Sequence, residues 1–215
     1  MQASVQNSFD AIQLQRSQIA SASEIAAKAF ENDPVFAYLT PENRELRLQA
    51  LTWLMGKAIE YCIPHNNVYT TPDLQGIAGW LPPYQFSSDP FQLLQLVMQL
   101  QLYNLPFKCG WNRAGRWLAF LSASEQAHQQ DMGDRPHWYL ELMVVNPASQ
   151  GKGIGSRLLQ PGLDRADRDG LPCYVVTFTE QAVRFYQKNG FEILRNQKLS
   201  PNTPPFWTLK RNPRS

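Results

Sequence analysis

The chain has 215 residues, a length typical of one globular domain with its own hydrophobic core. Hydrophobic residues make up 43% and charged residues 18%, which excludes a disordered or collagen-like chain. The formal net charge of +2, without a basic stripe, argues against nucleic acid and against an anionic membrane surface as partners. We expect a single domain over residues 1–215.

The cysteines and the N-terminus indicate the compartment. Cys62, Cys109 and Cys173 are widely spaced and form no CxxC pair, so they predict reduced structural thiols rather than a zinc or redox centre. The N-terminus lacks the basic and apolar regions of a signal peptide. Residues 90–107, the best candidate for a membrane span, contain glutamines, an asparagine and prolines and are too short. We therefore expect a cytoplasmic protein.

The N-terminal part of the chain alternates strands and helices. The patterns predict a strand at 11–15, a helix from Ser21 or Ser23 to Phe30, a helix over 41–62, and a hairpin of strands 68–71 and 76–81. Asp33 and Pro34 are expected to end the first helix, because the residue before a proline avoids the helical conformation.

The pattern of residues 91–130 predicts two helices, separated by a break at 106–110. In the first of these helices the glutamines share one face and apolar residues cover the rest. Such a helix is expected in the core. A lid over a substrate pocket and a homodimer face stay open as alternatives.

The C-terminal part predicts a strand at 137–145, a glycine turn at 150–155, a helix, a strand at 172–178, a helix at 180–189 ended by Gly190, and strands at 191–199 and 206–210. This order predicts an α/β fold with a mixed sheet and helices on its faces. Pro161 lies inside the first of these helices, where proline costs about 3 kcal/mol. We expect a kink there that seats the helix on the sheet.

The glycine turn Gln150-Gly-Lys-Gly-Ile-Gly155 lies between a strand and a helix. Its glycines let the backbone turn sharply and leave amide groups pointing outward, where the helix dipole adds positive potential. This pattern is typical of a pyrophosphate cradle, although a merely structural turn is an alternative. The dinucleotide fingerprint GxGxxG fails at Ser156, and the P-loop fails on spacing.

Two segments, LELMVVNPASQGKGIGSRLL and AVRFYQKNGF, resemble the GNAT superfamily of acetyl-CoA-dependent N-acyltransferases. The family hallmark, (Arg/Gln)-x-x-Gly-x-(Gly/Ala), is met by Gln150, Gly153 and Gly155. The resemblance is firm over residues 137–195 and loose in the N-terminal half. There, GIAGWLPP, together with the C-terminal FWTLKR, is similar to a subgroup that includes puromycin N-acetyltransferase.

The resemblance implies a GNAT-like mixed central sheet. Its two neighbouring parallel strands, 137–145 and 172–178, would splay apart in a V, with helices on both faces and an extra helical insertion before the fourth strand. Residues 1–130 would then form the acceptor-side half, and residues 137–212 the acetyl-CoA-binding half.

The same resemblance implies a set of acetyl-CoA contacts. Backbone groups near Met143 and Val145 would bind the pantetheine arm, and the amide near Val144 would stabilise an oxyanion. Thr179 stands where the family usually has an asparagine and could cap the following helix. The expected cofactor-binding residues are Met143, Val144, Val145, Gln150, Gly151, Lys152, Gly153, Ile154, Gly155, Ser156 and Thr179.

Acetyl transfer to an amine needs one group that accepts a proton and one that donates it. Tyr186 matches the family's proton donor, although it could be a core aromatic beside Phe185. Glu141 is the best candidate base, because alternation places it on one strand face with Tyr139 and Met143. An ion-pair role for Glu141, His137 as the base, and water remain alternatives.

We therefore expect an enzyme that transfers the acetyl group of acetyl-CoA to a primary amine of a small molecule by direct attack in a ternary complex. Cys173, inside a strand, is not expected to carry the acetyl group. Protein or peptide N-acetylation and a catalytically silent acyl-CoA sensor are the alternatives. His65 and His128 lack metal-ligand spacing, so no metal is inferred. Trp80, Phe30, Asp33 and Tyr38 are candidates for the acceptor pocket, although each could be core or cap.

Overall fold

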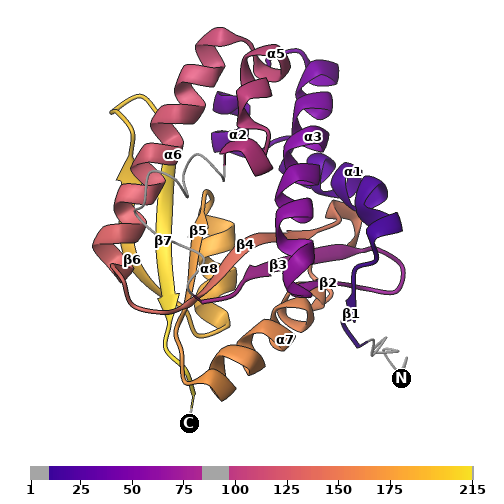
Figure 1. Cartoon of the computed structure of the whole chain (residues 1–215), viewed down its shortest axis with the longest axis vertical. Helices are drawn as coiled ribbons and strands as arrows, with labels where there is room; N and C mark the ends of the chain where they lie inside the picture. Colours follow the sequence, from indigo (N-terminus) through magenta and orange to yellow (C-terminus); the bar gives the residue numbers. More distant parts are fainter. Residues whose placement is uncertain (1–9, 84–96, 215) are drawn as a thin grey trace, which may run out of the picture.

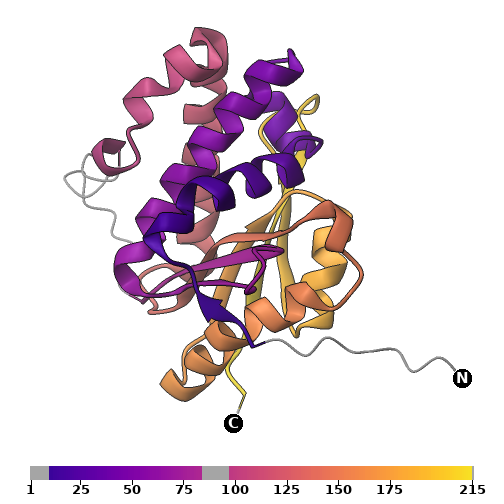
Figure 2. The same cartoon turned by 90° about the vertical axis from the view of Figure 1, so that its right-hand side faces the viewer.

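The computed structural model describes residues 10–83 and 97–214. These residues form a seven-stranded sheet in the order β1-β2-β3-β4-β5-β7-β6, with parallel and antiparallel pairs. Helices cover both faces of the sheet (Figure 1, Figure 2). The mixed α/β architecture expected from the sequence is confirmed.

The N-terminal half supplies the first three strands and the helices above one face. Its elements are β1 Ile12–Gln13, η1 Arg16–Gln18, α1 Ile19–Phe30, α2 Pro34–Leu39, α3 Arg44–Cys62, η2 Ile63–His65, β2 Val68–Thr70 and β3 Gly76–Leu81. The hairpin β2–β3 is antiparallel as expected.

Two helix starts differ from the sequence expectation. Helix α1 begins at Ile19, and the Ser23 hydroxyl donates to the Ile19 carbonyl at 2.6 Å instead of capping the helix. The Asp33 carboxylate accepts from the amides of Val35 and Phe36 and starts α2, a helix that the sequence did not predict. Pro34 is compatible with this because proline is favoured in a first helical turn.

The helical insertion contains η3 Leu102–Asn104, α5 Leu105–Cys109 and α6 Trp111–Met132. The break between α5 and α6 falls at Gly110, which adopts φ +88°. Residues 91–96 of the expected glutamine-faced helix lie outside the described residues.

The C-terminal half contains β4 Trp138–Val145, η4 Pro147–Ser149, α7 Ile154–Asp169, β5 Cys173–Thr177, α8 Glu180–Lys188, β6 Glu192–Lys198 and β7 Pro205–Arg211. Strands β4 and β5 pair in parallel only from Trp138 opposite Cys173 to Leu140 opposite Val175. Beyond Leu140, β4 continues to Val145 without a β5 partner. The expected V-shaped splay is therefore present.

A β-bulge in β4 explains where the splay begins. Gly79 of β3 is opposite Leu142 and Trp80 is opposite Leu140, so Glu141 is an extra residue in β4. A bulge bends its strand and increases the local twist, which turns β4 away from β5.

The bulge also shifts the alternation of side chains along β4. Before it, Leu140 packs in the apolar cluster under α7; after it, Leu142 and Val144 pack with Tyr139 in the cluster under α1 and α3, and Met143 packs under α7. The expectation that Tyr139 and Met143 share a face is wrong, because the extra residue reverses the period.

Helix α7 packs closely against Trp80 of β3. A Cβ atom on Gly162 would lie 2.2 Å from the Trp80 ring, so only glycine fits after Pro161. Trp80 is fully buried in the core and does not line the cavity described below. Trp80 is therefore a core residue, which was the alternative to its candidate place in the acceptor pocket.

Candidate functional site

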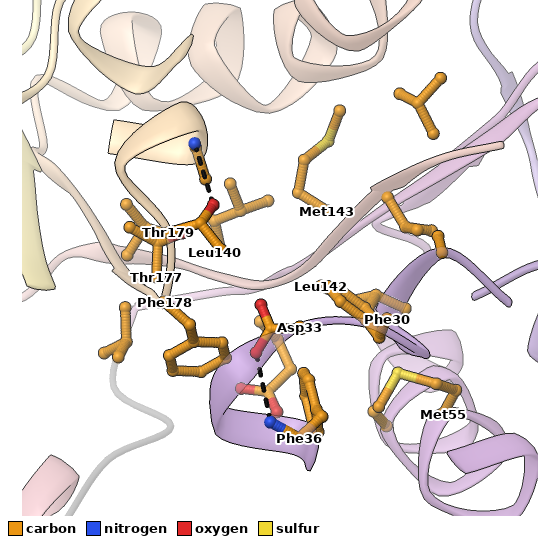
Figure 3. Close-up of a pocket in the computed structure, with 18 of the residues that line it drawn as sticks. Phe30, Asp33, Phe36, Met55, Leu140, Leu142, Met143, Thr177, Phe178 and Thr179 are labelled. Atoms are coloured by element: carbon orange, nitrogen blue, oxygen red, sulfur yellow. Dashed lines mark hydrogen bonds between the residues drawn. The ribbon is translucent and has the colours of Figure 1, made fainter. Parts of the chain in front are cut away.

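A cavity of about 1430 Å³ opens where β4 and β5 separate. Its walls come from both halves of the chain: α1, α2, α3 and α6 on one side, and β4, β5, the glycine turn and the start of α8 on the other. Figure 3 shows part of this wall, with Asp33 and Phe36 of the α2 region on the same side of β4 as Leu142, and the side chain of Met143 on the other side.

The glycine turn presents its backbone to the cavity. Gly151 and Gly153 both adopt φ +78°, a left-handed conformation that favours glycine, and a Cβ on either would meet no atom within 4 Å. No group in residues 10–83 or 97–214 accepts a hydrogen bond from the amides of residues 151–156. A row of unsatisfied amides at the start of the 16-residue helix α7 is suited to bind an anion.

Side chains around the turn support this backbone arrangement. The Gln150 side-chain amide donates to the Val145 carbonyl at 3.2 Å and ties the turn to the end of β4. A Cβ on Gly155 would lie 2.9 Å from Phe185, so glycine allows α7 to approach α8. Lys152 donates to the Ala148 carbonyl at 3.2 Å and does not line the cavity, unlike the other residues expected to contact acetyl-CoA.

Met143, Val144 and Val145 line the cavity on the part of β4 that has no β5 partner. Thr179 lines it at the start of α8, where its hydroxyl accepts a hydrogen bond from the Ala182 amide at 3.2 Å. The expected capping role of Thr179 is confirmed, because this contact satisfies one of the free amides of the first turn.

Tyr186 lies on α8 and lines the cavity. Its ring is 5% exposed and contacts the rings of Phe185 and Phe191, with centroids 5.2 and 5.5 Å away. Burial raises the pKa of its phenol, and no described residue hydrogen-bonds to the hydroxyl. A phenol that keeps its proton at neutral pH is suited to donate it.

Glu141, the bulge residue of β4, opens onto the cavity. Within the described ranges its carboxylate has no hydrogen bond or ion pair. Withdrawal from bulk water raises its pKa from 4.5 to about 7. Its charge also helps to raise the pKa of Tyr61 to about 12, although burial is the larger cause. A carboxylate with a pKa near 7 is poised to accept a proton at neutral pH.

His137 lies apart from the cavity. Its Nε2 is 2.7 Å from Nε2 of His128, and its Nδ1 is 2.7 Å from the Arg135 carbonyl. Burial lowers the pKa of His137 to about 4, so it is neutral at pH 7. The geometry disfavours His137 as the base.

The acceptor side of the cavity has an aromatic wall that we define as Phe36, Trp117, Phe120 and Phe178. The four rings contact one another in a closed circuit, with centroids 5.5 to 6.2 Å apart. Sequence reasoning did not single out these residues, because they come from α2, α6 and the end of β5 and share no local motif.

Among the residues expected in the acceptor pocket, Phe30 and Asp33 line the cavity. Tyr38 does not line the cavity. The Arg116 guanidinium instead stacks over the Tyr38 ring, 4.5 Å from the ring centroid. Tyr38, a candidate for the acceptor pocket, therefore lies outside the cavity.

Helix α6 is held on the sheet by Asp131. Its buried carboxylate accepts from Thr208 at 2.6 Å and Tyr174 at 3.1 Å, and pairs with Arg195. This network connects α6 to β5, β6 and β7, so it positions the part of the aromatic wall that α6 carries.

In the described part of the chain no group of three or more His, Cys, Asp or Glu residues could hold a metal ion, and no helix is long and apolar enough to cross a membrane.

Known proteins are similar to this chain in sequence and in fold. The family model described as acetyltransferase (GNAT) family matches residues 71–191, more than half of the chain. An uncharacterized N-acetyltransferase of Schizosaccharomyces pombe is 27% identical over 164 residues, which are 76% of this chain and 66% of the yeast protein. The chain therefore spans just under two thirds of that relative's length.

Two solved structures have the same fold. The protein described as histone acetyltransferase HPA2 and related acetyltransferase, from Corynebacterium glutamicum, has a TM-score of 0.62 and 21% identity, covering 97% of this chain and 98% of its own. The Drosophila melanogaster polyamine N-acetyltransferase has a TM-score of 0.61 and 15% identity, covering 95% of this chain and 100% of its own.

Proposed function

The chain belongs to the acetyltransferase (GNAT) family and is an acyltransferase, and from this premise we propose that it transfers the acetyl group of acetyl-CoA to a primary amine of a small molecule. One observation carries the proposal. A single cavity joins the unsatisfied amides of the glycine turn to an unpartnered carboxylate, Glu141, and a protonated phenol, Tyr186.

Acetyl-CoA fits the donor side of this cavity. The amides of residues 151–156 would hold its pyrophosphate. Met143, Val144 and Val145 pair with β3 but have no partner on the side of β5, and this free edge of β4 would bind the pantetheine arm. Gln150 and Thr179 would act by shaping this surface, since their side chains already hold backbone groups. The bound molecule supplies an activated acetyl thioester.

In the proposed mechanism Glu141 removes one proton from the incoming ammonium group, and the neutral amine attacks the thioester carbonyl. The C–N bond forms and the C–S bond breaks as Tyr186 gives a proton to the leaving sulfur. The second proton, lost from the amine nitrogen as the amide forms, restores the phenol of Tyr186. Glu141 is ionised above its pKa of about 7, where it can accept this proton. Attack is direct. Cys173 is fully buried away from the cavity, and burial raises the pKa of its thiol to about 12, so it is unsuited to act as an acetyl carrier.

The apolar side chains that helix α6 adds to the acceptor side favour a small amine over an extended peptide chain. These side chains are Trp117, Phe120 and Leu121. The Drosophila neighbour, described as a polyamine N-acetyltransferase, is consistent with a small amine but shows only the fold. Within the family, we place the chain in the subgroup similar to puromycin N-acetyltransferase, on the segments GIAGWLPP and FWTLKR.

The test is release of free CoA from acetyl-CoA over a panel of amines that includes puromycin, arylalkylamines, polyamines and an N-terminal peptide. Turnover on small amines, reduced about 100-fold in Tyr186→Phe with acetyl-CoA affinity retained, is the expected result. Tyr103→Phe is the matched control, because Tyr103 is 52% exposed and lies outside the cavity. Turnover on the peptide alone, or binding of acetyl-CoA without turnover on any acceptor, would contradict the proposal.

A further inference from the structure

Asp33 places a second carboxylate on the acceptor side of the cavity. It precedes α2, and Figure 3 shows its side chain between those of Phe178 and Phe30. One oxygen, Oδ1, accepts from the amides of Val35 and Phe36 at 2.9 and 3.2 Å. The other, Oδ2, has no hydrogen bond within residues 10–83 and 97–214.

Capping α2 does not require the charge of Asp33. Asparagine and serine cap helices about as well as aspartate does, and neither carries the cost of burying a charged group. Burial raises the pKa of Asp33 to about 6, so the carboxylate is still ionised above neutral pH. An ionised carboxylate beside the aromatic wall is stabilised when a cation pairs with it.

The chain itself does not supply that cation in its described part. Lys28, Lys57 and Lys188 line the same cavity, but none forms an ion pair with Asp33. Lys57 pairs with Glu60 at 2.7 Å. Arg44, the first basic residue after Asp33 in the sequence, pairs with Glu31, which does not line the cavity.

Asp33, before α2, and Glu141, on β4, are thus two carboxylates without cationic partners among the described residues that line one cavity together with the aromatic wall. An acceptor with one amine would satisfy Glu141 and leave Asp33 unpaired. We propose that Asp33 determines specificity by binding a second cationic group of the acceptor, so that the preferred acceptors are diamines or related dications with an apolar spacer. This inference rests on the proposed function.

The experiment compares matched pairs of amines that differ by one cationic group. The pairs are 1,4-bis(aminomethyl)benzene with 4-methylbenzylamine, and 1,5-diaminopentane with pentylamine. For each pair the ratio of kcat/KM, diamine over monoamine, is measured in wild type and in Asp33→Asn, which keeps the cap and removes only the charge. Equal melting temperatures verify that the variant folds.

We expect wild type to prefer each diamine by about tenfold or more, beyond the factor of two for its two amines, and Asp33→Asn to lose most of this preference through a higher KM for the diamine. Glu31→Gln is the control: it removes a charge of the same sign two residues away, outside the cavity, and should leave the ratio unchanged. The inference would be overturned if the diamine-to-monoamine ratio of kcat/KM in wild type were no more than the factor of two, or if Asp33→Asn kept the wild-type ratio. An equal loss of kcat on both members of a pair would assign Asp33 to proton transfer instead.

A binding measurement separates this inference from the proposed function. Each amine is titrated by calorimetry into the enzyme saturated with CoA, where no transfer takes place. Tighter binding of the diamine, lost in Asp33→Asn, supports the role of Asp33 even if no amine is turned over. Turnover of amines with no difference in binding between diamine and monoamine overturns the role of Asp33 and leaves the proposed function intact.

Discussion

The donor side of the cavity is formed by backbone groups, whereas the acceptor side is formed by side chains. On the donor side, the glycine turn and the free end of β4 present backbone groups, and the side chains of Gln150 and Thr179 only hold the backbone in place. On the acceptor side, the surface consists of side chains: the aromatic wall, Phe30, Asp33 and Glu141. A site formed by backbone groups depends on the conformation of the turn and tolerates different side chains, whereas a site formed by side chains changes with each substitution.

This difference predicts that substitutions separate into two groups. Changes in side chains of the acceptor side should alter rate and KM for the amine and leave acetyl-CoA affinity almost unchanged. Changes in backbone conformation of the donor side should lower acetyl-CoA affinity and leave KM for the amine almost unchanged.

The largest effect is expected at Glu141. Replacing it with glutamine removes the base while keeping shape, and should lower kcat by about 100- to 1000-fold. In wild type, kcat/KM should fall as the pH drops below about 7, because Glu141 is then protonated and a protonated carboxyl group cannot act as a base. The variant should lack this acidic limb, which a pH–rate profile measures. Glu60→Gln on the surface should keep it, and a variant profile identical to wild type would exclude Glu141 as the base.

Asp131→Ala should give the next largest effect. It leaves Tyr174, Thr208 and Arg195 without their buried partner, which costs about 3 kcal/mol of unfolding free energy. Because Asp131 holds α6 on the sheet, KM for the amine should rise as well. Denaturant unfolding and steady-state kinetics measure the two effects. Wild-type stability would show that this network does not hold α6.

Phe178→Leu should have a smaller effect confined to the acceptor. Leucine removes the ring that contacts Phe36 and Phe120 but keeps an apolar side chain, so unfolding free energy should fall by about 1 kcal/mol. KM for an aromatic amine should rise several-fold while acetyl-CoA affinity stays the same. An equal loss of affinity for both ligands would show that the two sides are not separable.

The smallest effect is expected at Thr179. Thr179→Ala removes the cap of α8 and should cost about 1 kcal/mol of stability, whereas Thr179→Ser keeps the hydroxyl and should cost little. Thermal unfolding of both variants measures this difference. Equal stabilities of the two variants would show that the hydroxyl contributes no capping energy.

The sequence predicts the donor side well because its signals are local. The turn after β4 needs glycine at Gly151 and Gly153 for a left-handed backbone, and Thr179 is recognisable as a cap from its position before a helix. The acceptor side is assembled from contacts distant in sequence, such as Phe36 with Trp117, and no short pattern marks them. The bulge at Glu141 was also hidden, because an extra residue in a strand becomes visible only when its partner strand is known.

The central claim is that the backbone of the glycine turn holds acetyl-CoA, and one calorimetric comparison tests it most directly. Gly153 and Gly170 both adopt a left-handed conformation, at opposite ends of α7, and neither would crowd a neighbour with a Cβ. Alanine at either position should cost a similar amount of stability, about 1 to 2 kcal/mol. The account predicts that Gly153→Ala loses acetyl-CoA affinity by tenfold or more, whereas Gly170→Ala binds like wild type. Equal affinities in the two variants would contradict it.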